Sequence, residues 1–130
     1  MRLRRSLTIT ALALSLPLIA TSAFAALNTW YSVPGFEGAK AEARIRYLRS
    51  PGTSSGHIHL INAGSNMYVQ RAPVARLGLD GDWKRATPNG SGLHPWSDST
   101  ISGYQGYKFR ICRDRGGRTD KCGDVRWIYR

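Results

Sequence analysis

The sequence has few of the groups from which metal and catalytic sites are built. Its 130 residues include two cysteines, three histidines and eight acidic residues. The two cysteines are not spaced as Cys-x-x-Cys, and no His or Cys set is complete enough to hold zinc. Because no complete catalytic or cofactor motif is present, we expect no metal site and no cofactor, and we assign no catalytic residue.

Long apolar runs are confined to the N-terminus. Three arginines within the first five residues precede an apolar stretch at residues 7–19, and Ala23 and Ala25 form a small-x-small cleavage site. The stretch is shorter than the roughly 18–20 residues that span a bilayer. The sequence therefore predicts a secretory signal peptide at residues 1–25 and a secreted, extracellular mature chain without a membrane span.

Acidic residues are scarce relative to basic ones. Three of the 19 Lys and Arg and none of the eight acids lie in residues 1–25, which leaves 16 basic and 8 acidic side chains and a net charge of +8. Such a chain favours anionic partners, such as wall polymers, acidic glycans, nucleic acid or an acidic protein. Basic residues are densest near the C-terminus, where Arg113 and Arg115 are candidate binding residues.

Cys112 and Cys122 are the only cysteines. An isolated pair in an exported chain predicts a disulfide. This bridge closes a loop of about ten residues, for which chain-entropy arithmetic gives about 2.5–3 kcal/mol.

No long amphipathic helix is evident, and short alternating segments separated by turns predict an all-β fold, a small antiparallel β-sandwich or barrel. Residues 39–49 favour a strand because residues 41–47 alternate without a break, although Ala41, Ile45 and Leu48 also share one face of a helix. Residues 57–63 and 67–74 are expected to form a hairpin. The other expected elements are a loop at 50–56, short strands at 83–86 and 93–97, and a disulfide-stapled C-terminal hairpin of 104–112 with 125–129.

The mature chain divides into an N-terminal arm at residues 26–38 and a single β domain at residues 39–130. The arm carries Trp30, Tyr31 and Phe36, which are too apolar for a free terminus. Two alternatives stay open: the arm docks on another secreted protein, or it folds back as an edge strand of its own domain.

His57 and His59 share a face if they lie on a strand. They are either a metal or acid–base pair, for which His94 or Asp98 is the available third ligand, or polar residues on a solvent-facing surface. A secreted ribonuclease needs a base, an acid and cations that stabilise phosphate. The candidates for these roles are Glu37 or Glu42, His57 or His59, and Arg44, Arg46 or Arg110.

Four tryptophans and six tyrosines are many for a chain of this size. Trp83 and Trp96 lie in turn-rich polar segments, so we expect them to be partly exposed and to serve binding. Phe109 and Trp127 are expected in the core. The aromatic groups can stack on sugars or anchor a protein partner.

The tail, with residues 106–114 (GYKFRICRD), Asp120-Lys121-Cys122-Gly123 and Trp127, resembles the ending of many small secreted proteins of actinobacteria. This resemblance implies a compact β-sandwich. Some similar proteins serve as adaptor subunits of secreted umbrella-shaped antibacterial toxin particles, where they join a lectin subunit to a larger toxin.

The sequence thus favours a secreted, non-enzymatic binding or interaction module, with an adaptor role in an extracellular toxin complex as its most specific form. Two alternatives stay open. One is a free-standing module that binds an anionic wall polymer or glycan, and the other is a small basic secreted ribonuclease or other hydrolase.

Overall fold

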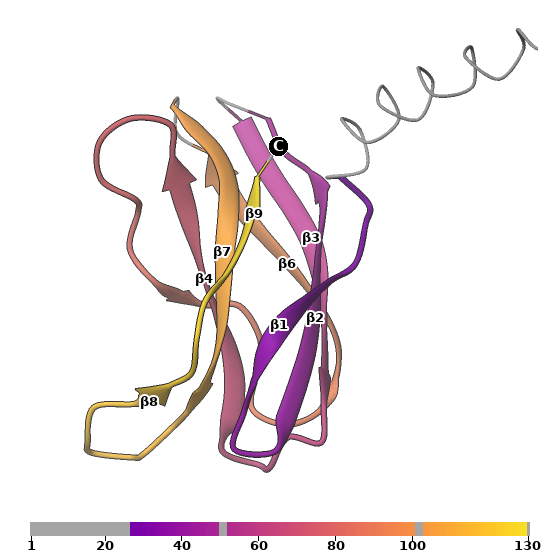
Figure 1. The fold of residues 1–130 in the computed structure, drawn as a ribbon, viewed down its shortest axis with the longest axis vertical. Coiled ribbons are helices and arrows are strands. Elements are labelled where there is room, and N and C mark those ends of the chain that lie inside the picture. The colour runs from indigo at the N-terminus through magenta and orange to yellow at the C-terminus, as the bar shows by residue number, and fades with distance from the viewer. Residues whose placement is uncertain (1–26, 50–51, 101–102, 130) are drawn as a thin grey trace, which may run out of the picture.

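The computed structural model describes residues 27–49, 52–100 and 103–129, and the expected signal peptide lies outside them. All nine regular elements of these residues are strands, arranged in two antiparallel sheets that pack as a sandwich (Figure 1). The all-β prediction is confirmed. The strands are β1 (Tyr31–Phe36), β2 (Ala39–Tyr47), β3 (Gly52–Ile61), β4 (Met67–Ala75), β5 (Lys84–Arg85), β6 (Gly92–Thr100), β7 (Tyr104–Arg113), β8 (Lys121–Cys122) and β9 (Arg126–Tyr129).

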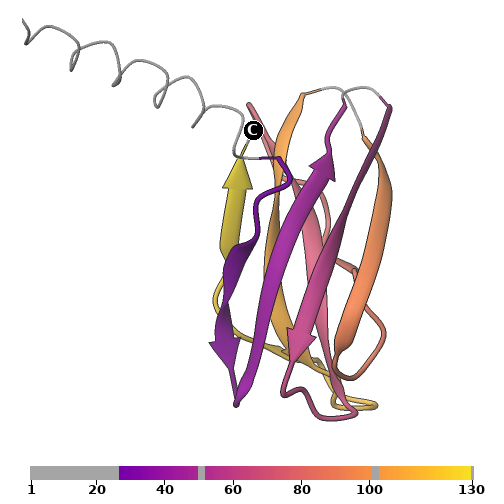
Figure 2. The same ribbon diagram turned by 90° about the vertical axis from the view of Figure 1, so that its right-hand side faces the viewer.

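Sheet A has the strand order β1-β2-β3-β6 and faces the reader in Figure 2. The strand favoured for residues 39–49 is confirmed as β2. Its alanines and Ile45 are buried, while Lys40 and Glu42 are exposed on the opposite face. The strict alternation of the sequence therefore follows one buried and one solvent-facing surface.

The segment that was expected as an arm belongs to this sheet. Tyr31–Phe36 pairs with β2 as its outermost strand, and the backbone N–H of Asn28 donates to the carbonyl oxygen of Ile45 at 2.8 Å. Glu37 and Gly38 both have positive φ, as a two-residue hairpin turn requires. The structure thus favours the edge-strand alternative.

Sheet B has the order β5-β4-β7-β8, and β9 pairs with the same side of β7 beyond β8. On β7, Tyr107, Phe109 and Ile111 point into the sandwich and are fully buried, as their alternation predicted. Lys108 and Arg110 lie on the outer face. The expected C-terminal hairpin is confirmed in the pairing of β7 with β8 and β9.

The expected hairpin of residues 57–63 with 67–74 is wrong. A turn does follow β3, since the N–H of Met67 donates to the carbonyl oxygen of Gly64 at 3.1 Å, but the chain then crosses to the other sheet. Strand β3 pairs with β2 and β6, and β4 pairs with β5 and β7. Turn residues mark where the chain reverses but do not determine which sheet receives the next strand, which depends on burying both inner faces.

Strands β3 and β6 are both longer than expected. Strand β3 begins at Gly52, inside the expected loop at 50–56, because β6 pairs with it from Gly52 to Leu60 and satisfies its backbone groups. Pro95 does not interrupt β6, since β6 is the outermost strand of sheet A and an edge strand tolerates a missing N–H.

An aromatic cluster joins the two sheets in the core. The ring of Trp96 lies 4.8 Å from that of Tyr107 and 5.8 Å from that of Phe109, between ring centroids. Trp96 is only 5% exposed, so its expected role as an exposed binding group is wrong. It pairs with Gly56, whose missing side chain leaves room for the indole: a Cβ there would lie 2.7 Å from Trp96 Nε1.

A buried ion pair also connects the sheets. The Nη2 atom of Arg71 on β4 lies 3.5 Å from Asp98 Oδ2 on β6, and the same guanidinium donates to the carbonyl oxygens of Arg85 and Ser97 at 2.9 and 3.1 Å. This pair closes the side of the sandwich between β4 and β6.

Within the described ranges, no helix is long and apolar enough to cross a membrane.

Candidate functional site

The disulfide fixes the base of the loop between β7 and β8. Cys112 and Cys122 are directly paired residues of the two strands, with Cα atoms 4.0 Å apart and the sulfurs bonded, as predicted. Residues 114–120 therefore project from sheet B as a pinned loop. Four cationic side chains lie on this loop and on the strand residues at its two ends.

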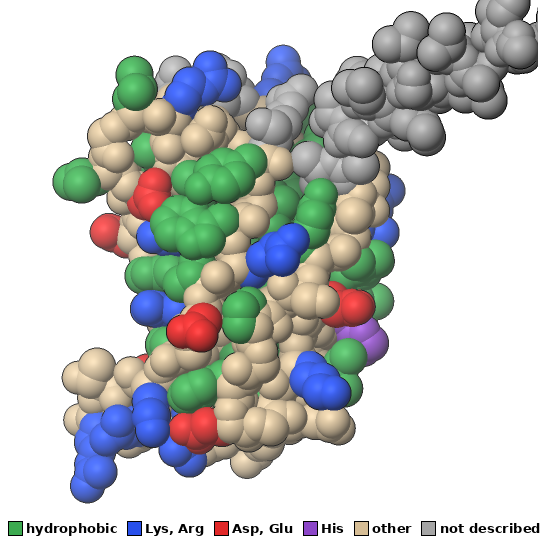
Figure 3. All heavy atoms as spheres, viewed as in Figure 1, with side chains coloured by type: hydrophobic (Ala, Val, Ile, Leu, Met, Phe, Trp, Pro, Cys, Tyr) green, Lys and Arg blue, Asp and Glu red, His purple; other side chains and the backbone are tan. Residues whose placement is uncertain are grey.

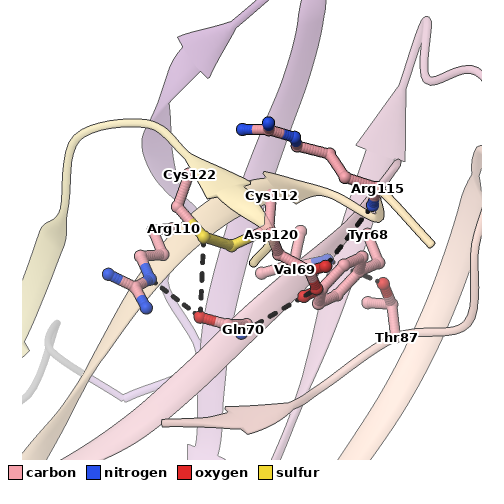
Figure 4. Close-up of a disulfide and its surroundings, with 9 residues drawn as sticks. All are labelled: Tyr68, Val69, Gln70, Thr87, Arg110, Cys112, Arg115, Asp120 and Cys122. Atoms are coloured by element: carbon pink, nitrogen blue, oxygen red, sulfur yellow. Dashed lines mark hydrogen bonds between the residues drawn. A yellow bond between two sulfur atoms is a disulfide. The ribbon is translucent and has the colours of Figure 1, made fainter. Parts of the chain in front are cut away.

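A chain of polar contacts holds that loop to β4 (Figure 4). Arg110 Nε donates to Gln70 Oε1 at 2.8 Å, and the same oxygen lies 3.8 Å from the sulfur of Cys122. Gln70 Nε2 donates to the hydroxyl oxygen of Tyr68 at 3.2 Å, and the Tyr68 hydroxyl donates in turn to Asp120. The disulfide and this network fix the loop from two directions.

The contact between Tyr68 and Asp120 shifts the pKa values of the two side chains in opposite directions. Burial raises the pKa of Tyr68, and the hydrogen bond to Asp120 raises it further. The pKa of Asp120 is lowered, first by the hydrogen bond from Tyr68 and then by the backbone N–H of Arg115 and by nearby cations. At neutral pH the phenol is thus the donor and the carboxylate the acceptor.

The loop surrounds an open hollow of about 460 Å³, which we call the basic hollow. Glu37 lies 2.8 Å from Arg113 Nη2 and 3.6 Å from Lys121 Nζ, so it partly neutralises these two cations. Among the described residues, no carboxylate forms an ion pair with Arg115 or Arg118. Figure 3 shows Lys and Arg side chains gathered where this loop projects. The hollow is lined by Asn66, Arg113, Asp114, Arg115, Arg118 and Lys121.

Aromatic rings and cations alternate on the outer face of the same sheet. The Lys108 ammonium lies 4.8 Å from the centroids of both Trp83 and Trp127, and the Arg110 guanidinium lies 4.1 Å from Trp83. Trp127 and Tyr129 are nearly parallel, with an interplanar angle of 11° and centroids 6.4 Å apart. We call this set of Trp83, Lys108, Arg110, Trp127 and Tyr129 the aromatic strip.

The exposure of Trp127 corrects its expected place in the core. Trp127 is 43% and Tyr129 50% exposed, whereas Ile128 between them is buried. Ile128 is paired with Tyr107, whose ring points into the sandwich, and directly paired residues share a face. The register therefore directs both aromatic rings outward. Their alternation with Ile128 indicates that the two rings share a face, but it does not indicate that this face is the outer one.

The connection between β4 and β5 lies over this face and positions two members of the strip. Asp80 Oδ1 accepts a hydrogen bond from the N–H of Ala75 at 2.8 Å, and Lys108 Nζ lies 3.1 Å from Asp80 Oδ2. The Ala75 hydrogen bond is the main cause that lowers the pKa of Asp80. Leu77 and Leu79, on the same connection, are 89% and 92% exposed.

The structure separates the three aromatic residues expected to bind through the arm. Trp30 is exposed beside the outer face of sheet A, where the Arg44 guanidinium lies 4.7 Å from its ring. Tyr31 and Phe36 pack partly buried against the core instead. These residues therefore form no common surface.

The two histidines lie on the outer face of sheet A, while Ile58 and Leu60 are buried, as the second alternative for this pair predicted. His94 is paired with Ile58, so it points inward, away from His57 and His59. Asp98 likewise engages Arg71 between the sheets. In the described part of the chain, no group of three metal-ligating side chains occurs.

The register also sorts the ribonuclease candidates. Glu42 is paired with His59 and Arg44 with His57, and Arg44 Nη2 lies 3.4 Å from His57 Nδ1. Glu37, by contrast, forms an ion pair with Arg113, and Arg110 lies on the outer face of sheet B.

A Gly-x-Ser-x-Gly spacing, typical of hydrolase nucleophiles, occurs at residues 52–56, so the expectation that the sequence has no such nucleophile motif is wrong. Ser54 is fully buried within strand β3, between the sheets. A nucleophile of this type needs an exposed turn between a strand and a helix. Ser54 lies inside a strand instead, so we do not assign it as a nucleophile.

Sheet B thus carries three of the predicted binding residues, Trp83, Arg113 and Arg115. It also carries Trp127 and Tyr129, which were not predicted as binding residues. Comparison of the chain with protein-family models, with curated proteins and with solved structures finds no match.

Proposed function

We propose that the protein is a secreted, non-enzymatic binding module that uses sheet B to bind an anionic glycan polymer of a cell wall. The observation that carries this proposal is the exposed, nearly parallel pair of Trp127 and Tyr129, with Trp83 beside them through their shared contact with Lys108. The aromatic strip provides the apolar contacts, and the basic hollow provides the charge.

Aromatic rings suit sugar rings because both present flat surfaces. The negative face of an aromatic ring attracts the weakly positive C–H groups of a pyranose, and its area becomes buried without a large loss of side-chain freedom. Trp127 and Tyr129 lie two residues apart on the same face of β9, and their ring centroids are 6.4 Å apart. Such a row favours an extended chain of sugars over a single small molecule.

The basic hollow suits the phosphate or carboxylate groups of the same polymer. Arg115 and Arg118 form no ion pair within the described residues, so their guanidinium groups are available for bidentate contacts with an oxyanion. Pinning by the disulfide and by the contact of Tyr68 with Asp120 holds the loop in place before the ligand binds, which reduces the entropy lost on binding.

An extracellular location fits this ligand. The signal-peptide pattern at residues 1–25 supports export, and a disulfide that holds a binding loop persists in an oxidising compartment.

The test measures retention of the mature protein on purified phosphate-bearing cell walls and on the same walls after removal of the phosphate polymer. We expect Trp127→Ala with Tyr129→Ala to weaken retention on both materials. Arg115→Ala with Arg118→Ala should weaken it on the phosphate-bearing walls only and reduce its salt dependence. The matched controls are Tyr47→Ala and Lys40→Ala with Arg46→Ala on sheet A, which should bind normally.

If the sheet A variants lost as much wall retention as the sheet B variants, the proposal that sheet B binds the wall polymer would be contradicted. Assays for ribonuclease, muramidase, esterase and protease activity complete the test, because robust turnover abolished by His57→Ala or His59→Ala would replace the binding module with an enzyme.

A second function, docking on a secreted protein as an adaptor subunit, is favoured by Leu77 and Leu79. Two leucines exposed to about nine-tenths on one connection are unusual on a soluble surface, and apolar residues of this kind anchor protein partners. A tagged protein would then recover a stoichiometric partner from native culture supernatant, and Leu77→Ser with Leu79→Ser would lose it while wall binding persists.

A further inference from the structure

The outer face of sheet A has a composition that the proposed function does not use. Figure 2 shows this sheet from outside, with no described segment lying across it. Its side chains form rows across the four strands because directly paired residues share a face. We call it the histidine face. It includes Lys40, Glu42, Arg44, Arg46, His57 and His59, with Trp30 beside Arg44.

One row consists of three planar groups and a proline ring. The Arg44 guanidinium lies 4.7 Å from the ring of Trp30, and its Nη2 lies 3.4 Å from Nδ1 of His57, which is in turn paired with Pro95. The row therefore runs from an indole through a guanidinium and an imidazole to a pyrrolidine ring. The neighbouring row contains Glu42 and its directly paired residue His59.

The charge of this face is positive and is not neutralised internally. Lys40 and Arg46 are exposed, and no described carboxylate forms an ion pair with either of them. Glu42 is the one acidic residue of the face. Two open hollows flank the histidines, one of about 440 Å³ that Arg46, His57 and Pro95 help to line and one of about 300 Å³ beside Lys40 and Glu42.

We propose that the histidine face binds single-stranded nucleic acid. Trp30 and His57 stack on bases, and Lys40, Arg44 and Arg46 contact phosphates. Planar side chains interleaved with cations on an open sheet are the combination that single strands require, since every base has a face to stack and every nucleotide a charge.

Duplex DNA fits this surface poorly. Its bases are accessible only through a groove, which a projecting helix or ribbon must enter, and the face of sheet A is open and carries no projecting element among the described residues. Sheet B is a weaker candidate for a single strand. The cations of its aromatic strip are committed, Lys108 to Asp80 and Arg110 to Gln70. Its basic hollow has available arginines, but no aromatic residue lines it.

The test measures binding of a fluorescein-labelled oligouridylate to the mature protein by fluorescence anisotropy at several salt concentrations. Lys40→Ala with Arg46→Ala removes two exposed cations from the histidine face. We expect weaker binding and a salt slope shallower by about 1.4, since each phosphate contact on a single strand contributes about 0.7. Arg115→Ala with Arg118→Ala removes the same charge from sheet B and should change neither quantity appreciably.

Two further variants test whether ring stacking and the sign of individual charges matter, beyond the total charge of the face. Trp30→Ala should weaken binding at least about fivefold, as expected for loss of one stacked base, while Tyr129→Ala on sheet B should not. Glu42→Gln should tighten binding, because it removes the one negative charge beside the phosphates. Equal losses from the two double variants, a larger loss from the sheet B variant, or no binding of the oligomer at about 0.15 M salt would overturn the proposal.

Discussion

The two outer faces of the sandwich use the same residue types, aromatic rings and cations, in different ways. On sheet A the cations Lys40 and Arg46 are exposed and unpaired within the described residues, and no described segment covers the strands. On sheet B the connection between β4 and β5 lies over the strands, the disulfide loop is tied to Tyr68 through Asp120, and Lys108 contacts two rings and Asp80.

The difference shows that composition alone does not define a binding surface. A long loop over a sheet face supplies partners that fix each cation and ring, as Asp80 does for Lys108. Such a surface is rigid and suits a ligand with a regular repeat. An open face leaves its charges available, so it suits a flexible polyanion. The predictions that follow perturb one face at a time, from the largest expected effect to the smallest.

Removing the disulfide should have the largest effect and should act on sheet B. Cys112→Ser with Cys122→Ser is expected to lower the free energy of unfolding by about 2.5–3 kcal/mol, from the lost constraint on a loop of about ten residues. Urea unfolding measures the change. Wall retention should fall because the basic hollow loses its frame, while oligouridylate binding should persist at a temperature where the protein stays folded. Equal loss of both activities would contradict the independence of the two faces.

Gly56→Ala is the corresponding perturbation beneath sheet A. The new Cβ would meet the carbonyl oxygen of Arg44 at 1.9 Å and Trp96 Nε1 at 2.7 Å, so β2 or the indole must move. We expect destabilisation of about 1–3 kcal/mol by overpacking, measured by thermal unfolding. Gly78→Ala is a control in open space, although its positive φ makes a smaller loss expected there too. A stability unchanged by Gly56→Ala would refute the account of Trp96 packing.

Lys108→Met should sharpen the account of the aromatic strip. The substitution keeps the aliphatic stem but removes the charge that lies 4.8 Å from Trp83 and Trp127. We expect a loss of about 0.5–1 kcal/mol for each cation–π contact and increased mobility of Trp127, seen in its fluorescence anisotropy decay. Lys84→Met, a neighbouring exposed lysine without such contacts, should leave both measurements unchanged.

The loop should loosen at both extremes of pH, with the smallest effect. The pKa of Asp120 is lowered on folding, so its stabilising contribution is present above its ordinary value of 3.8 and is lost as the pH falls through its folded pKa. The pKa of Tyr68 is raised, so its contribution is present below 10.0 and is lost as the pH rises through its folded pKa. NMR titration of the loop amides checks this.

The matched variant Tyr68→Phe should remove the alkaline transition of the loop. It should also raise the pKa of the Asp120 carboxyl towards its ordinary value. If the loop amides of Tyr68→Phe titrate as those of the unaltered protein do, the hydrogen bond between Tyr68 and Asp120 is not what holds the loop.

Local pattern was sufficient for much of the fold. Alternation within residues 39–49 and 104–112 predicted the strands β2 and β7, and two cysteines in a chain with an export pattern predicted their bridge. The pairing of β3 with β6 could not be predicted in this way. It joins residues about forty positions apart, and the Gly- and Ser-rich start of β3 forms a strand only because β6 completes its hydrogen bonds.

The candidate site was harder to predict than the fold. Trp96 was expected to be exposed and is buried, whereas Trp127 was expected in the core and is exposed. Each tryptophan lies on the opposite side from the one expected, because the face it occupies is set by its pairing with the neighbouring strand. Trp96 is paired with inward-facing Gly56, and Trp127 with outward-facing Lys108. Side-chain alternation identifies two faces of a strand but not which of them meets the other sheet.

The sequence by itself determined the strand content, the disulfide and the excess of positive charge, because each depends on residue type and on neighbours along the chain. Only the tertiary structure decided that Trp83, Trp127 and Tyr129 share a surface, that Arg115 and Arg118 line one hollow, and that His57 lies beside Arg44 on the opposite sheet. These arrangements depend on which strands pair and in which register, and that choice is made by burying the inner faces of both sheets together.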